Sequence, residues 1–272
     1  MKDGHEYLSL ETLCNWFGIS RQAYYQHEWN LTEESFRYSL VLDEVKAIRQ
    51  RHPRMGMRKL QELLCPFMRD NKIKMGRDAL FDLLSAHKLL VRTRKRHVRT
   101  TCSYHWLKKY PNLIIDFTPS KPNQLWVSDI TYWKIGETNF YISFITDAYS
   151  RKIVGYHLSE NLHAEQTMEA LKMAFAELKE YHRTSEQLIH HSDRGSQYCS
   201  SPYVNLLKKK HINISMTQNG DPLENAIAER VNGILKDEYL LNYQCSNIKD
   251  ARKQLAKSVS LYNNERPHGW FG

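Results

Sequence analysis

The first third of the chain has apolar residues at the spacing of amphipathic helices. Apolar positions in residues 9–17 share one helical face, Gly18 then ends the helix, and Ser20 can cap a second helix. Two short helices joined by a glycine-containing turn predict a helix-turn-helix unit in residues 1–30. The alternative is a helical hairpin that only packs on its neighbours. If the unit binds DNA, its second helix lies in the major groove, and the side chains that reach the bases are Arg21, Gln22 and Tyr25.

The helical pattern continues through residues 31–91. Thr32 can cap a helix that runs to about Arg51. Two further helices are expected over residues 56–65 and 76–90, each with leucines on one face. The segment is therefore expected to form a second helix-turn-helix-like unit.

From residue 123 onward the pattern changes to short runs rich in β-branched and aromatic residues, which favour strands. Lys121-Pro122 marks a domain boundary, so residues 122–272 are expected to form one domain. Three strands in a meander followed by alternating helices and strands predict an α/β fold. The expected strands cover residues 124–135, 140–147, 152–158, 188–191 and 212–216, and the expected helices cover residues 164–179, 201–210, 221–240 and 249–262.

Composition narrows the class of protein. Of the 272 residues, 41% are hydrophobic and 25% are charged, which is typical of a globular protein. No apolar run approaches the ~20 residues of a membrane span, and the N-terminus has no apolar signal-peptide core, so we expect a soluble cytoplasmic protein without a membrane partner. The five cysteines form no Cys-x-x-Cys pair, and we assign His190 and His191 to a strand end rather than to a zinc site.

The positive charge is concentrated in the N-terminal part. The net charge is +9, and residues 1–120 hold 21 basic and 13 acidic residues. Eight Lys and Arg between Lys88 and Lys109 occur without one acidic residue. Such a run favours binding to a phosphate backbone, and the alternative is a solvated linker. We expect residues 92–121 to be a basic linker whose DNA contacts include Arg94, Lys95 and Arg96.

Three acidic residues stand out by their positions. Asp129 lies in an apolar strand, where a carboxylate is costly to bury without a cation or hydrogen bonds. Asp193 follows the end of another strand, which is where ligands of α/β sheets bind. Glu229 lies on a helix, and Lys236 follows it by two turns on the same side. Three such carboxylates can hold a pair of Mg²⁺ ions that catalyse phosphodiester displacement.

Each of these acids also has a structural interpretation. Asp129 can be an edge-strand residue, Asp193 can only begin a turn with Gly195, and Glu229 can be a surface residue. Arg194, beside Asp193, can contact DNA or serve only the turn.

These residues resemble the integrase-type DDE transposases of bacterial insertion sequences, specifically the downstream-frame product of the insertion sequence three family. Asp193 and Glu229 are separated by 35 residues, which is that family's hallmark, and the resemblance covers nearly the whole chain. The motifs that carry it are Trp126-Val-Ser-Asp-Ile-Thr-Tyr132, His191-Ser-Asp-Arg-Gly-Ser-Gln-Tyr198, Asn225-Ala-Ile-Ala-Glu-Arg230, Lys236 and Tyr262-Asn-Asn-Glu-Arg-Pro-His268.

The resemblance implies a ribonuclease H-like catalytic domain. It implies that Asp129, Asp193 and Glu229 bind two Mg²⁺ or Mn²⁺ ions and that Lys236 contacts DNA. It further implies an enzyme that cleaves the ends of its element and transfers the freed 3′-hydroxyl into target DNA. Such proteins act at the bacterial nucleoid as homo-multimers on paired terminal inverted repeats, commonly fused to an upstream-frame protein.

Two other functions remain as alternatives. The sequence ends four residues after His268, whereas relatives usually continue further, so one alternative is a truncated, non-catalytic DNA-binding regulator of its own element. The second alternative is a ribonuclease H-type nuclease that acts on RNA–DNA hybrids.

Overall fold

A computed structural model describes residues 9–91, 105–135, 138–180, 187–218, 225–240, 245 and 247–268 of the chain. Residue contacts divide the chain into two compact units. The N-terminal unit comprises Met1–Arg51 and Met55–Arg92, and the C-terminal unit comprises His52–Arg54 and Thr93–Gly272. Each unit is described by itself.

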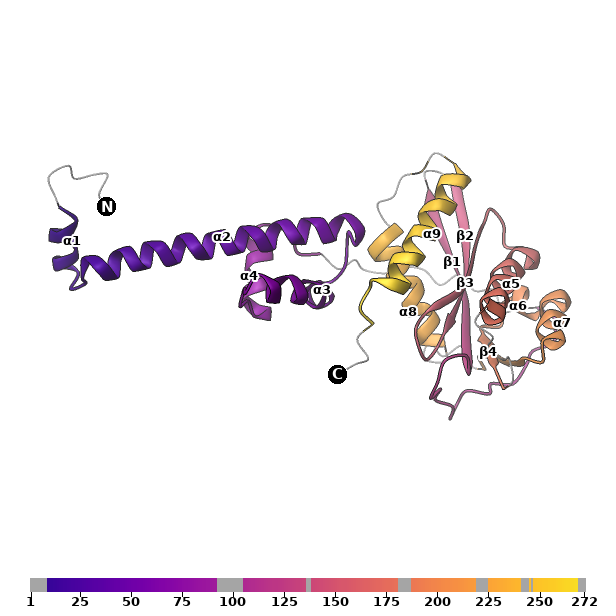
Figure 1. Cartoon of the computed structure of the whole chain (residues 1–272). Helices are drawn as coiled ribbons and strands as arrows, with labels where there is room; N and C mark the ends of the chain where they lie inside the picture. The colour runs from indigo at the N-terminus through magenta and orange to yellow at the C-terminus, as the bar shows by residue number, and fades with distance from the viewer. Residues whose placement is uncertain are drawn as a thin grey trace. The chain divides into compact units, whose positions relative to one another are not determined.

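The N-terminal unit is helical, as the sequence predicts (Figure 1). The first two helices are joined as expected, because Gly18 adopts a φ of +66° in the turn and the Ser20 hydroxyl accepts a hydrogen bond from the Ala23 amide at 3.0 Å. The helices are α1 (Leu10–Trp16), α2 (Arg21–Arg51), α3 (Met57–Asp70) and α4 (Arg77–Ala86).

The expected helix start at Thr32 is wrong. Residues 21–51 form one continuous helix, and the Thr32 hydroxyl donates to the Glu28 carbonyl oxygen of the preceding turn at 2.9 Å instead of capping a new helix. The sequence from Arg21 to Arg51 contains neither proline nor glycine, so nothing interrupts the helix. The boundary that we placed after residue 30 therefore lies inside α2.

Only the second half of α2 packs in a core. Val41, Val45 and Ile48 are buried against leucines of α3 and α4, whereas no residue of 21–40 is buried. The N-terminal half of this helix is therefore available as a surface.

The C-terminal unit is built on a five-stranded sheet with the order β3-β2-β1-β4-β5. The first three strands form an antiparallel meander, and β4 and β5 join it in parallel. This is the strand arrangement of a ribonuclease H-like domain, which confirms the predicted fold class. The strands are β1 (Leu125–Ile135), β2 (Thr138–Asp147), β3 (Ile153–Ser159), β4 (Ile189–Ser192) and β5 (Asn213–Met216).

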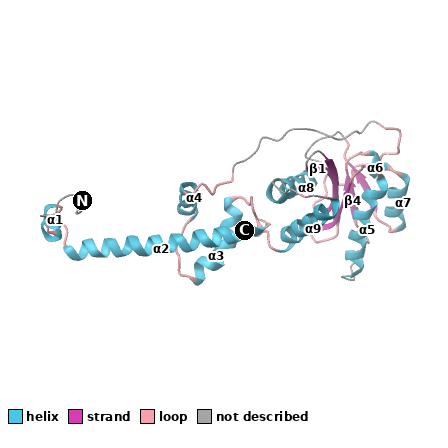
Figure 2. Cartoon of the chain, turned by 90° about the horizontal axis from the view of Figure 1, so that it is seen from above, coloured by secondary structure: helices cyan, strands magenta, loops and turns pink. Residues whose placement is uncertain are grey.

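Helices cover both faces of this sheet (Figures 1 and 2). One apolar core contains Trp126 of β1 and the inner residues of three helices, and the other contains Trp133 of β1 and the inner residues of the remaining helices. The first set is α5 (Ala164–Glu180), α6 (Ser196–Cys199) and α7 (Ser201–Lys209), and the second set is α8 (Ala226–Ile234), the π-helix η3 (Leu235–Leu240) and α9 (Ile248–Asn264).

Within the described ranges, none of the helices combines the length and the hydropathy that a bilayer span requires.

Candidate active site

The register of two parallel strands brings two of the predicted acids together. Ser128 of β1 pairs with Ser192 of β4, and this is the last pair between the two strands. Asp129 and Asp193 are the next residues of their chains. Because neighbouring strands lie about 4.8 Å apart, Asp129 and Asp193 lie side by side at the point where β4 ends and β1 continues to Ile135. β1 is a central strand of the sheet, between β2 and β4, and its pairing with β4 ends one residue before Asp129, where pairing with β2 continues.

Asp129 is a half-buried carboxyl with two hydrogen-bond donors. Its Oδ1 accepts from the Ile130 amide at 2.8 Å, and its Oδ2 accepts from Nδ2 of Asn232 on α8 at 2.7 Å. Burial, followed by repulsion from Asp193 and then Glu229, raises the pKa of Asp129 to about 7 despite these donors. The site therefore concentrates negative charge at a position where a cation would relieve it.

Asp193 is fixed by a turn. Its Oδ1 accepts a hydrogen bond from the Gly195 amide at 2.9 Å, so the turn that we weighed as an alternative is present and also orients the carboxylate. A Cβ atom on Gly195 would lie 3.0 Å from the same Oδ1, which is tighter than ordinary contact. The next residue, Arg194, is half-buried, and its Nε atom is buried without a hydrogen-bond partner among the described residues.

Glu229 stands on the first turn of α8 and is exposed. Asn232 follows it by three residues, close to one turn, so the helix face that carries Glu229 also carries the amide that holds Asp129. In the described part of the chain, no three His, Cys, Asp or Glu side chains stand close enough together to hold one metal ion. The structure thus pairs the two aspartates and leaves the glutamate exposed on the adjacent helix.

Asn232 is a residue that our sequence analysis missed. It is buried, and its Oδ1 has no hydrogen-bond partner among the described residues, so burial of this amide is costly. The only signal in the sequence is its spacing from Glu229, which does not reveal a bond to a residue 103 positions away.

Lys236 lies where the helix geometry changes. The expectation that it shares a side with Glu229 assumed two regular α-helical turns, but η3 begins at Leu235 with π-helical geometry. The Lys236 ammonium lies 4.2 Å from the ring centroid of Tyr132 on β1, which is a cation–π contact.

The other predicted DNA contacts lie elsewhere. Arg21, Gln22 and Tyr25 are exposed on the first turns of α2 in the N-terminal unit. Residues 94–96 of the basic run, and the expected helix cap at residues 221–224, lie outside the described residues.

The strand beneath the two aspartates is held by a buried polar network. His190 Nε2 lies 2.7 Å from the Ser128 hydroxyl and 2.9 Å from the Tyr203 hydroxyl of α7. Burial, reinforced by His191, lowers the pKa of His190 to about 3, so this imidazole is neutral. The network joins β1, β4 and α7 directly behind Asp129.

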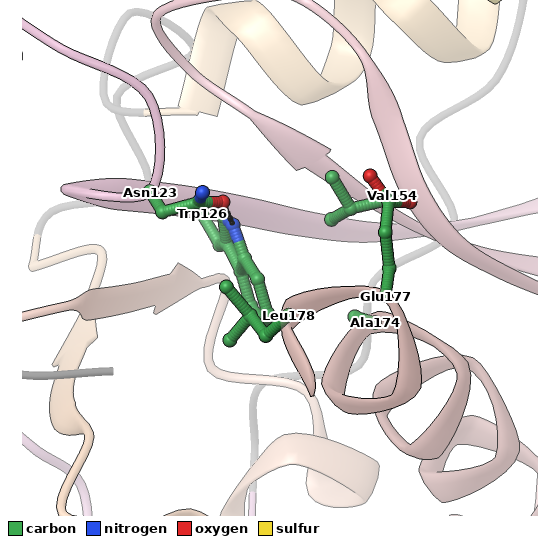
Figure 3. Close-up of a pocket in the computed structure, with 6 residues that line it drawn as sticks. All are labelled: Asn123, Trp126, Val154, Ala174, Glu177 and Leu178. Carbon is green, nitrogen blue, oxygen red and sulfur yellow. Dashed lines mark hydrogen bonds between the residues drawn. The ribbon is translucent and has the colours of Figure 1, made fainter. Parts of the chain in front are cut away.

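The pocket in Figure 3 is separate from the acids. It lies between the sheet and α5, and the Trp126 indole donates to the Asn123 side-chain oxygen at 3.2 Å there. None of the three acids lines it. Its lining residues are Asn123, Trp126, Val154, Ala174, Glu177 and Leu178.

The donor set fits divalent cations. Two neighbouring carboxylates, one within β1 and one just after β4, and a third on the adjacent helix offer oxygen ligands, which Mg²⁺ and Mn²⁺ prefer. The raised pKa of Asp129 supports this fit, because its causes include the mutual repulsion of these same three acids.

Comparisons with known proteins agree with this geometry. Two family models, each described as "Integrase core domain", match residues 119–222 and 210–272. The chain is 36% identical over 265 residues to the "Insertion element IS600 uncharacterized 31 kDa protein" of Shigella sonnei, covering 96% of this chain and 94% of that protein. It is 28% identical over 268 residues to the "Transposase for insertion sequence element IS629" of Shigella sonnei, covering 96% and 88%.

Among solved structures, the chain is similar to the HTLV-2 integrase catalytic core domain in complex with magnesium in its trimeric form. The sequence identity is 19%, the TM-score is 0.45, and the match covers 56% of this chain and 93% of that one.

Proposed function

Because this chain belongs to the integrase-type transposases of bacterial insertion sequences, we propose that Asp129, Asp193 and Glu229 are its catalytic carboxylates. The chain is a DNA transposase, a metal-dependent polynucleotidyl transferase. The assignment of the three acids depends above all on one observation. The β1–β4 pairing ends at Ser128 and Ser192, so Asp129, within β1, and Asp193, just past the end of β4, are neighbours.

The metal count is part of the proposal. We infer that the three acids bind two Mg²⁺ or Mn²⁺ ions. When bound, such a pair activates the attacking oxygen and stabilises the leaving oxygen of a phosphodiester.

The chain's own residues would set the geometry of the ligands. The Ile130 amide and Asn232 hold the two oxygens of Asp129, and the Gly195 amide holds Asp193. Glu229, exposed on α8, is the ligand that can change its rotamer as the ions and DNA arrive. Lys236, above Tyr132, and Arg194, next to Asp193, would contact phosphates beside the cleaved bond.

The proposed reaction has two steps on DNA. The enzyme cleaves one strand at each end of its element, and the freed 3′-hydroxyl attacks target DNA. We propose that Arg21, Gln22 and Tyr25 read the terminal inverted repeats and that the basic run 92–121 binds backbone phosphates. A homo-multimer would hold paired ends, and an upstream-frame protein fused to this chain would assist recognition of those ends.

The test is a strand-transfer assay. The full chain is incubated with end-labelled duplex from the DNA that flanks its gene, a supercoiled target plasmid and Mg²⁺ or Mn²⁺. We expect cleavage at one position of one strand, followed by metal-dependent joining of the label to the plasmid. Repetition with the upstream-frame protein fused to the chain tests whether that partner is needed.

The same assay separates the alternatives. DNA binding unaffected by Mg²⁺, with no cleavage by either form of the protein, would favour a non-catalytic regulator. Faster cutting of an RNA–DNA hybrid than of duplex DNA would favour a ribonuclease H-type nuclease.

A further inference from the structure

The segment of residues 105–113 lies beside β5 at the edge of the sheet and is held there by hydrogen bonds. At its start, His105 Nε2 donates to the carbonyl oxygen of Arg194 at 2.7 Å. At its end, the Leu113 amide donates to the Ser215 hydroxyl at 2.8 Å, and the Met216 amide donates to the Pro111 carbonyl oxygen at 3.2 Å. The segment is therefore held by a side chain at its start and by its backbone at its end.

Some side chains of this segment pack on the core and others are exposed. Leu107 and Tyr110 pack against the core on the α5 side of the sheet. Trp106, Lys108 and Lys109 are exposed, and Trp106 is 92% exposed. Large aromatic side chains are usually mostly buried, but the Trp106 indole is exposed although its segment is held in place. We take this exposure to indicate a ligand.

The end of α7 extends this surface. Lys208, like Lys209 and Lys210, is exposed, and its ammonium lies 6.0 Å from the ring centroid of Tyr110. Lys108 approaches the same ring at 5.5 Å. The two segments therefore meet at Tyr110 and form one continuous surface.

Basic residues predominate over acidic ones on this surface. Residues 105–115 and 194–218 contain six Lys and Arg and no Asp or Glu. On the neighbouring helix α5, Glu177 is neutralised by an ion pair with Lys152 at 2.7 Å. A surface with this charge attracts phosphate groups.

One end of this surface lies next to Asp193. Arg194, whose carbonyl oxygen holds His105, directly follows Asp193. The pKa of the Cys199 thiol is raised by burial and by Asp193, and Lys109 and Arg194 oppose this effect.

We propose that Trp106, Lys108, Lys109 and the lysines at 208–210 bind the DNA strand adjacent to the three-acid site. The lysines contact phosphates, and Trp106 stacks on an unpaired base of that strand. Lysines that follow a backbone beside an aromatic side chain are the usual combination for single-stranded nucleic acid, because every base offers a face for stacking. This inference rests on the proposed function and names the form of DNA that the same site takes.

The lysines are tested by the salt dependence of binding. The affinity of the full chain for a labelled duplex with a five-nucleotide overhang is measured by fluorescence anisotropy over a range of salt. The variant Lys108→Ala/Lys208→Ala should lower the slope of log affinity against log salt by up to about 1.8, since each lost phosphate contact removes about 0.9. The matched control is Lys253→Ala/Lys257→Ala, which removes two exposed lysines from α9 on the other face of the sheet and should leave the slope unchanged.

The indole is tested by comparing two DNA forms. Trp106→Ala should weaken binding of the overhang duplex by roughly 5- to 150-fold and leave a blunt duplex of the same sequence nearly unaffected. Trp106→Tyr should restore most of the loss.

If Trp106→Ala weakened binding of both duplexes equally, or if the lysine variant had the same salt slope as the control, the proposed DNA contacts of this surface would be wrong. Cleavage by the wild-type chain would still support the proposed function in that case. A wild-type chain that neither binds nor cleaves DNA would overturn both.

Discussion

A single carboxyl group, that of Asp129, shows how the site differs from the rest of the core. It lies within β1 beside Asp193, and its pKa is raised to about 7 by burial and by the two other acids. In the unfolded chain the same group would titrate near 4. Its ionisation therefore opposes folding in metal-free protein.

The first prediction concerns the pH dependence of stability. Because the pKa is higher in the folded state, the stabilising effect of the proton is complete below about pH 4 and is lost as the pH rises to about 7. Asp129→Asn should therefore raise the melting temperature at pH 8 in EDTA, by about 2–4 °C for each kcal/mol relieved. The difference from wild type should shrink toward pH 4 in thermal denaturation. A difference that does not depend on pH would contradict the origin proposed for the shift.

The second prediction concerns Asn232. Asn232→Leu removes the donor to Asp129 Oδ2 and keeps a side chain that branches at Cγ, although leucine is the larger residue. Cleavage should fall by about 10- to 100-fold, as for other residues that position metal ligands, and more Mg²⁺ should be needed for half-maximal rate. DNA affinity should stay the same. An unchanged Mg²⁺ dependence would show that Asn232 is only structural.

At the residue scale, the sequence predicts the three acids but not the side chain that hydrogen-bonds to Asp129. Asp129, Asp193 and Glu229 are recognisable by chemical type and spacing. Asn232 is not, because its role depends on a contact between α8 and β1 that only the folded chain creates.

At the scale of elements, boundaries follow local signals wherever these are strong. The observed β1, Leu125–Ile135, differs by one residue from the expected strand, because apolar β-formers end at a turn on either side. Helices are harder to delimit. α2 merges two expected helices for lack of a breaker, and α3 continues through Pro66 to Asp70. The π geometry from Leu235 has no local signal that we recognised.

The third prediction tests how α5 packs on the sheet. Gly155 of β3 is so close to α5 that an added Cβ atom would lie 2.1 Å from the Ala170 carbonyl oxygen. Gly155→Ala should therefore destabilise the protein by about 1–3 kcal/mol or more, because backbone must move to relieve the clash. Thermal or urea denaturation measures this loss. Gly56→Ala is the control, since its added Cβ atom meets nothing within 4 Å. An equal loss in both variants would contradict a specific close approach.

At the scale of the whole molecule, the positive charge and the three acids belong to different parts of the chain. Residues 1–120 hold most of the positive charge, whereas the three acids belong to the C-terminal unit. The sequence indicates both parts, since helical periodicity gives way to strand-like runs near residue 123. It does not give the register that joins Asp129 to Asp193, because pairing between distant strands is set by the folded sheet.

The fourth prediction concerns the basic run. Replacing Arg94, Lys95 and Arg96 together with alanine should weaken DNA binding and reduce the salt slope by up to about 2.7. Anisotropy measurements at several salt concentrations test this, with Lys253→Ala/Lys257→Ala as the control. An unchanged slope would indicate that the run is only a linker.

The central claim is that Asp129, Asp193 and Glu229 form a single metal-dependent site for DNA cleavage. The most direct test compares nicking of supercoiled plasmid carrying the flanking DNA by Glu229→Gln and by Glu169→Gln. Glu169 is an exposed glutamate of α5 that pairs with Lys172 at 2.6 Å, so its replacement removes the same charge elsewhere. We predict that Glu169→Gln nicks like wild type in Mg²⁺ or Mn²⁺, whereas Glu229→Gln binds DNA with wild-type affinity and does not nick. Nicking by Glu229→Gln at the rate of the control would contradict the account.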